Sequence, residues 1–140
     1  MDWIEERDEE YILEKYNIRP GELNVKITNS DWLLYSAEEI CRIVNAGKLL
    51  PELKKLRIRM KYGVKDELLS LLKLKNVGRV RARKMHNAGL TDLGKVKKAN
   101  ISTLAQLVGK KTAADIKQQL GEKVEPVVSK KTGQQSISDY

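Results

Sequence analysis

The sequence contains no phenylalanine, one cysteine, one histidine and three prolines in 140 residues. Without phenylalanine, the core must be built from Leu, Ile, Val and Ala. A lone Cys41, predicted to lie in the core, excludes an internal disulfide and a cysteine-rich metal site. A lone His86 excludes paired-histidine metal motifs, so we expect it packed or at the surface. No phosphate-binding Walker loop and no Ser/His/Asp set is present, so we expect no catalysis, cofactor or metal in this chain.

Long apolar runs are also absent. No stretch approaches the roughly 20 apolar residues that a membrane span needs. The start of the chain is charged and amphipathic, which is unlike a secretory signal. We therefore expect no membrane contact and a reducing, cytoplasmic location close to the nucleoid.

Charge is distributed unequally along the chain. The formal net charge is +8, but residues 1–50 hold eleven acids and six bases, whereas residues 51–140 hold eight acids and twenty-one bases. A basic segment following an acidic one favours a polyanion, such as nucleic acid, as the partner of the basic part. The alternative is a lysine-rich surface that only keeps the protein in solution.

Apolar periodicity predicts an all-α fold, a helical bundle segment followed by a small helix-hairpin-helix domain and a disordered tail. In the bundle segment we expect helices over residues 2–16, over 22–46 with Gly47 as the cap, and from Pro51 to Gly63. Ser36 begins a capping-box pattern, so the long helix could also restart there. The predicted division is 1–62, 63–122 and a polar tail at 123–140.

A glycine turn followed by a basic helix marks the second part. We predict a leucine-rich helix over 66–74, a turn at Gly78 and a helix over 79–88 that Gly89 ends. Free amides at such a turn, together with the helix dipole, bind phosphate oxygens without reading bases. The predicted DNA-binding residues are Lys75, Gly78, Arg79, Arg81, Arg83 and Lys84. Ala82, Met85, Val80 and Ala88 are predicted to face inward. The alternative is an ordinary basic surface helix.

A weak internal sequence repeat suggests a second hairpin. The pattern from Leu71 to Met85 recurs from Leu104 to Ile116, two residues shorter at the turn, with Gly109 matching Gly78. Further helices are predicted from Thr91, from Ser102 to Leu107 and from Thr112 to Leu120. Chance similarity between two Leu/Ala-rich helices is the alternative. Lys110, Lys111 and Lys26 are secondary DNA-binding candidates.

Trp32 points away from the apolar arc of the long helix at about 100° per residue. That arc consists of residues 27, 33, 34, 37, 40, 41 and 44. An exposed Trp on a polar face suggests a stacking platform for a base or a docking point for another domain. Packing within this chain is the alternative.

Three segments resemble a known family, namely 31–36 (DWLLYS), 61–69 (KYGVKDELL) and 77–89 (VGRVRARKMHNAG). They look like the C-terminal end of archaeal superfamily-two DNA helicases of the Hjm type, which are related to the helicase part of polymerase theta. The resemblance covers about residues 1–120. It implies that the chain is a fragment lacking the motor domains, which in the parent would bind ATP and Mg²⁺.

The resemblance also implies a function. The parent would be an ATP-dependent, three-prime to five-prime helicase acting on forked or stalled replication and recombination DNA. Residues 1–62 would end its ratchet domain, where Trp32 falls on a base-stacking position, and the terminal domain would grip single-stranded DNA and restrain unwinding. A basic residue in some members corresponds to Val25 here, beside Lys26. The usual first hairpin glycine is Asn76, which tolerates the left-handed turn.

Two further interpretations concern protein partners. In the tail, Gln134, Ile137 and Tyr140 resemble the box that binds the sliding clamp, ending at its first aromatic residue. Besides DNA and the parent's own motor domains, the clamp is therefore an expected partner. The runner-up function is a protein-interaction scaffold that docks replication partners, with its basic charge incidental.

Overall fold

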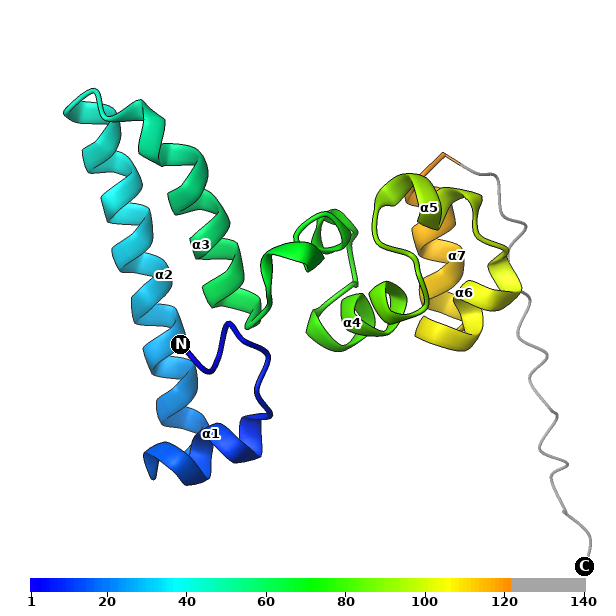
Figure 1. The fold of residues 1–140 in the computed structure, drawn as a ribbon, viewed down its shortest axis with the longest axis horizontal. Helices are drawn as coiled ribbons and strands as arrows, with labels where there is room; N and C mark the ends of the chain where they lie inside the picture. Colours follow the sequence, from blue (N-terminus) through cyan, green and yellow to red (C-terminus); the bar gives the residue numbers. More distant parts are fainter. Residues whose placement is uncertain (122–140) are drawn as a thin grey trace, which may run out of the picture.

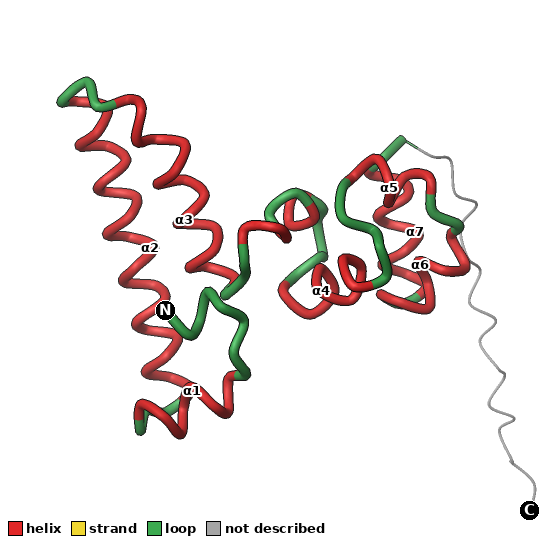
Figure 2. The backbone as a smooth tube through the Cα atoms, in the orientation of Figure 1, coloured by secondary structure: helices red, strands yellow, loops and turns green. Residues whose placement is uncertain are grey.

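The computed structural model describes residues 1–121, and within this range the protein is all-α, as predicted (Figures 1 and 2). The α-helices are α1 (Glu9–Tyr16), α2 (Pro20–Ile43), α3 (Leu50–Tyr62), α4 (Arg79–Asn87), α5 (Leu93–Lys98), α6 (Ile101–Val108) and α7 (Lys110–Gln119). Short 3-10 turns occupy Gly47–Leu49, Asp66–Leu68 and Leu71–Lys73. Among these residues, no helix combines the length and apolarity needed to cross a membrane. The predicted tail lies outside the described residues.

Helices α2 and α3 lie side by side and form a projecting arm (Figure 1). Pro20 occupies the first turn of α2, and Glu22 Oε2 accepts a hydrogen bond of 2.7 Å from the Arg19 amide. The expected long helix is confirmed, and a restart at Ser36 is wrong, because its hydroxyl bonds the Trp32 carbonyl within α2. Gly47 is not the cap, since α2 ends at Ile43 and Asn45 turns the chain with a φ of 56°.

The N-terminal segment, which we define as residues 1–7, forms turns where the sequence predicted helix from residue 2. Glu6 adopts a φ of 63°, and α1 begins only at Glu9. The indole of Trp3 donates a 2.7 Å hydrogen bond to the Met60 carbonyl at the end of α3. This tertiary contact holds the backbone away from the helical path that local propensity favours.

The second part packs around its own apolar core. Buried members of that core are Val64, Leu68, Leu71, Leu74, Val77, Ala82, Met85, Val96, Leu104, Val108, Ala113 and Ile116. The predicted helix over 66–74 is replaced by two 3-10 turns, which still bury its leucines. Val80 is 66% exposed and Ala88 is also exposed, so their predicted inward orientation is wrong. Val80 precedes the buried Ala82 by two residues, about 200° around the helix.

The remaining helix starts differ from prediction by one or two residues. The Asp92 carboxylate accepts from the Lys95 amide and starts α5, and the Asn100 side chain accepts from the Ser102 amide and starts α6. Helix α7 begins at Lys110, directly after Gly109, and not at Thr112. Small polar caps therefore set the starts of α5 and α6, because they satisfy free amides, whereas α7 starts after a glycine without a side-chain cap.

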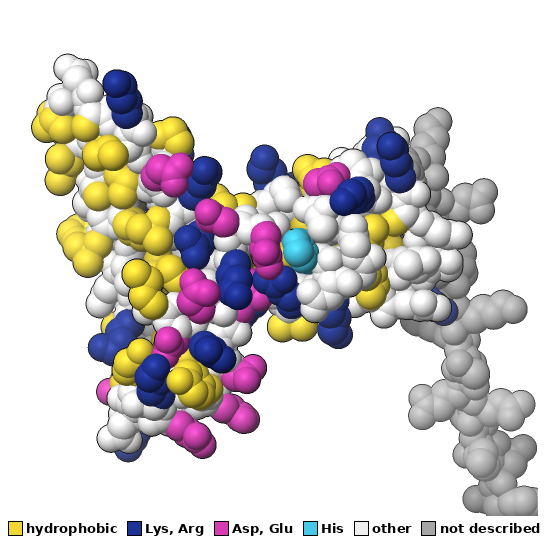
Figure 3. All heavy atoms as spheres, viewed as in Figure 1, with side chains coloured by type: hydrophobic (Ala, Val, Ile, Leu, Met, Phe, Trp, Pro, Cys, Tyr) yellow, Lys and Arg dark blue, Asp and Glu magenta, His cyan; other side chains and the backbone are white. Residues whose placement is uncertain are grey.

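The predicted apolar arc of α2 divides between two faces. Ile27, Leu34 and Cys41 are half-buried, so Cys41 lies at the edge of the packing and not in the core. Leu33, Ile40 and Val44, together with Val25, Trp32 and Ile43, are exposed on the outer face. We call these six residues the outer stripe. Figure 3 shows apolar side chains gathered over this arm.

Candidate nucleic-acid interface

The first hairpin is the turn that leads into α4. Asn76 takes a left-handed φ of 62°, whereas Gly78 has a φ of −101°, so the asparagine supplies the special conformation. A side chain at Gly78 would meet no atom within 4 Å, which leaves the backbone open to a close ligand. The first helical amide bond joins Ala82 N to Gly78 O at 2.9 Å. Helix geometry therefore directs the preceding amides outward at the positive pole of the helix.

Two side chains brace this turn. The Gln119 amide accepts from Lys75 N at 2.8 Å and donates to Lys75 O at 3.3 Å. Arg81 donates to the Asn76 carbonyl at 3.0 Å. Sequence reasoning missed Gln119, because its contact lies 44 residues away along the chain and no local pattern marks it. The turn is thus held in one shape before any ligand binds.

The second hairpin repeats the first in three dimensions. Gly109, with a φ of 92° and ψ of 151°, is the residue before α7, and Ala113 N donates to its carbonyl at 2.9 Å. Val108, Ala113 and Ile116 are buried in the core as Val77, Ala82 and Met85 are. The weak internal sequence repeat therefore corresponds to two hairpins with matching buried positions.

Both hairpins open onto one groove of about 620 Å³. Its walls are formed by Gly78, Arg79, Val80, Arg81 and Lys84 on one side and by residues 105–109 on the other. Positive ends of α4 and α7 both adjoin this groove, and Lys110 and Lys111 directly follow Gly109. This arrangement combines amide donors and positive charge, which is the chemistry that binds phosphate.

Basic side chains around the groove divide into two sets. Lys75, Lys84, Lys110 and Lys111 are exposed and form no ion pair with the other described residues. Arg83 instead binds Glu6 with two hydrogen bonds of 2.6 and 2.7 Å and pairs with Glu67 at 2.7 Å. The predicted basic cluster is therefore only partly open to a ligand.

Electrostatics at Arg83 agree with this pairing. Burial raises the pKa of Glu6, but hydrogen bonds from Arg83 and the Lys65 amide outweigh it and leave that pKa below its usual range. The hydrogen bond to Glu6 is the main cause that raises the pKa of Arg83. Arg79 lies over the Trp3 ring at 4.8 Å and donates to the Arg7 carbonyl. Glu6 and Trp3 were not recognised from the sequence.

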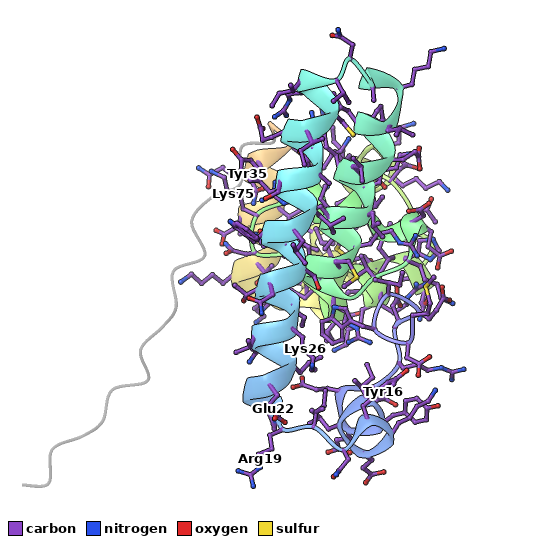
Figure 4. All side chains as sticks on the ribbon, turned by 90° about the vertical axis from the view of Figure 1, so that its left-hand side faces the viewer. Tyr16, Arg19, Glu22, Lys26, Tyr35 and Lys75 are labelled. Atoms are coloured by element: carbon purple, nitrogen blue, oxygen red, sulfur yellow. The ribbon has the colours of Figure 1, made fainter. Side chains whose placement is uncertain are left out.

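Trp32 is 66% exposed on the outer face of α2, as its position predicted. Lys26 is exposed on the same helix, and Figure 4 shows it on α2, which belongs to the arm and not to the hairpin domain. Tyr35 is 46% exposed and carries Arg57 over its ring at 5.0 Å. Two aromatic side chains are therefore accessible along the middle of α2.

His86, which we expected to be packed or at the surface, is half-buried. Within residues 1–121 no group of three metal-ligating side chains is present. The suggested clamp-binding residues Gln134, Ile137 and Tyr140 lie outside the described residues.

Comparison with known proteins assigns both segments. Residues 1–63 match the family model described as archaeal helicase, domain 4, and residues 68–122 match the SAM-like helix-hairpin-helix tandem. The chain is 46% identical over 116 residues to the ATP-dependent DNA helicase Hel308 of Methanococcus vannielii, covering 79% of this chain and 15% of the relative. For the Hel308 of Methanocaldococcus jannaschii the identity is 39%, over 98% of this chain and 10% of the relative.

A third relative extends the agreement. The Hel308 of Pyrococcus horikoshii is 35% identical over 94% of this chain and 19% of its own length. The chain thus spans between a tenth and a fifth of the length of these relatives. The resemblance inferred from the three sequence segments is confirmed.

Proposed function

Because residues 1–63 belong to the archaeal helicase domain 4 family and residues 68–122 to a helix-hairpin-helix tandem family, we propose that this chain is the DNA-binding, motor-regulating region of an ATP-dependent helicase. Residues 1–62 would end the ratchet domain and residues 63–122 would form the terminal domain. ATP and Mg²⁺ would act in motor domains outside this chain. The parent would unwind forked and stalled replication and recombination DNA in the three-prime to five-prime direction.

The hairpin domain grips single-stranded DNA through phosphates. One observation carries this proposal: the two hairpins share a groove that adjoins two helix N-termini. Arg81 and Lys84 lie on one wall, and Lys110 and Lys111 follow the other. Since these contacts are to the backbone, the grip does not depend on base sequence. Lys75, beside the braced turn, adds a further positive charge.

Fluorescence anisotropy with single-stranded, duplex and forked DNA at two salt concentrations tests the proposal. We expect binding that weakens steeply with salt, because phosphate contacts release counterions. A preference for single-stranded or forked DNA over duplex is expected for a grip on one strand. Negligible binding at low salt, or binding that ignores salt, would refute the grip.

Trp32 supplies a second contact by stacking on a base of the same strand. Its side chain is 66% exposed, and base–aromatic stacking contributes about 1–3 kcal/mol. Trp32→Leu keeps an apolar side chain and removes the aromatic face, whereas Trp32→Tyr keeps an aromatic face. If stacking is the contact, the Leu variant weakens single-strand binding about fivefold or more and the Tyr variant does not. Equal weakening in both variants would contradict stacking.

A protein-interaction function is favoured by one separate observation. The outer stripe of α2 is apolar and exposed, with Ile43 at 79% and Val44 at 61%, and such a surface marks a protein contact. We assign the contact of its C-terminal members, Ile40, Ile43 and Val44, to the parent's own motor domains, which leaves Trp32 accessible to the strand. Partner binding that persists at high salt while DNA binding is negligible would favour the scaffold function for the whole chain.

The tail gives a further proposal about partners. Gln134, Ile137 and Tyr140 would bind the sliding clamp through a short anchor motif. Titration of a tail peptide against the clamp tests this, with Ile137→Ala plus Tyr140→Ala as the matched variant. An unchanged affinity in that variant would refute the motif.

A further inference from the structure

The N-terminal segment touches both the arm and the hairpin domain. Trp3 covers Gly63 so closely that a Cβ at this glycine would lie 2.5 Å from the ring. The indole also bonds the Met60 carbonyl at 2.7 Å. On the opposite side, the same segment contacts the basic helix α4 through Glu6, Arg7 and Trp3. Residues at the start of the chain thus join two parts that follow much later in sequence.

All three guanidinium nitrogens of Arg83 face carboxylates in this arrangement. Its Nε and one terminal nitrogen bind the two Glu6 oxygens, and the other terminal nitrogen pairs with Glu67. Glu6 also accepts from the Lys65 amide at 2.9 Å, in the link between arm and hairpin domain. The Arg83 and Glu6 side chains are 27% and 12% exposed, so water screens this pair only in part. One arginine facing two carboxylates contributes no net positive charge for a phosphate.

Arg79 also contacts the N-terminal segment. Its guanidinium stacks on Trp3 and donates to the carbonyl of Arg7. Arg79 and Arg83 are four residues apart and share one face of α4, directed at the N-terminal segment. Arg81 and Lys84 line the groove that both hairpins share. Arg79 borders this groove as well, but its guanidinium is bound on the side of the N-terminal segment, whereas Arg83 lies on that side alone.

We infer that Arg79 and Arg83 are positioning residues, which together with Trp3 and Glu6 form a latch that fixes the hairpin domain on the arm. DNA phosphates are contacted by Arg81, Lys84 and the lysines of the second hairpin. The latch holds the groove at a set angle to the arm that carries Trp32. This assignment of roles rests on the proposed grip, whereas the latch itself does not.

The experiment combines a distance and a salt titration on the full chain. Spin labels at Lys48→Cys and Lys98→Cys, in a Cys41→Ser background, report the distance between the arm tip and α5. We expect Arg83→Gln and Glu6→Gln each to broaden this distance distribution, and the double variant to broaden it no further. Arg83→Lys, which keeps the charge, should recover part of the narrow distribution. A narrow distribution in Arg83→Gln would overturn the latch.

DNA binding by the same variants separates positioning from contact. For a short single strand, Arg83→Gln should leave the slope of log affinity against log salt concentration unchanged. A longer strand that also spans Trp32 should bind the variant about fivefold more weakly than it binds wild type. A slope reduced by about 0.7, the value of one lost phosphate contact on a single strand, would overturn the assignment of Arg83. If wild-type protein binds no DNA, the proposed function fails, yet the distance measurement still decides the latch. Circular dichroism confirms that each variant keeps its helices.

Discussion

Removing three lysines at the shared groove gives the sharpest test of the phosphate grip. Lys84→Gln, Lys110→Gln and Lys111→Gln change exposed side chains that form no ion pair within residues 1–121. Folding should therefore be unaffected. Only the charge that faces a bound strand is altered.

The expected magnitude follows from the number of contacts. With Arg81 and these three lysines each neutralising one phosphate, the slope of log affinity against log salt is about −2.8 for a single strand. Wild-type affinity should then fall about 50-fold between 50 and 200 mM salt, as measured by fluorescence anisotropy. The triple variant keeps one contact, a slope of about −0.7 and a loss of about threefold.

A matched control distinguishes contact from net charge. Lys48→Gln, Lys54→Gln and Lys55→Gln remove the same charge from the tip and flank of the arm. This control should keep the wild-type slope. If both triple variants lower the slope equally, the basic charge acts only through the overall field of the protein, and the assignment of the groove is wrong.

Further predictions concern the parts that hold the groove in place. Gly63→Ala should lower stability to urea by about 2–4 kcal/mol, because a φ of 65° disfavours a side chain and the new Cβ strikes Trp3. Gln119→Ala removes two hydrogen bonds from the hairpin turn and should cost about 1–2 kcal/mol in the same measurement, with weaker DNA binding at unchanged salt slope. Because the pKa of Glu6 is lowered from 4.5, its contribution is complete above that value and is lost as pH falls through the folded pKa. The melting temperatures of wild type and Glu6→Gln should therefore differ at neutral pH and converge in acid, and an equal difference at pH 3 would contradict the role of this carboxylate.

The sequence predicted those features that repeat locally. Apolar spacing over four turns indicated α2, and the shared pattern of Ala82 with Met85 and of Ala113 with Ile116 indicated two hairpins. These positions are buried as expected. Periodicity works here because each helix turns one regular face to a neighbour.

Features that depend on distant contacts could not be predicted. The partners Glu6 and Arg83 are 77 residues apart, and Gln119 is 44 residues from the turn it braces. An arginine in a basic run looks the same in sequence whether it faces a phosphate or a carboxylate. The start of α1 was predicted too early for the same reason. The contact of Trp3 with Gly63, and not the residues next to Trp3 in sequence, determines the backbone conformation there.

The junction at Trp3 and Gly63 also makes the arm a lever. Helix α3 has 13 residues and rises from this junction over roughly 20 Å to the arm tip. A rotation of ten degrees at the junction would move that tip by roughly 3.5 Å. Stiffness in a few side chains near Gly63 therefore sets how far the distant end of the arm can swing relative to α4.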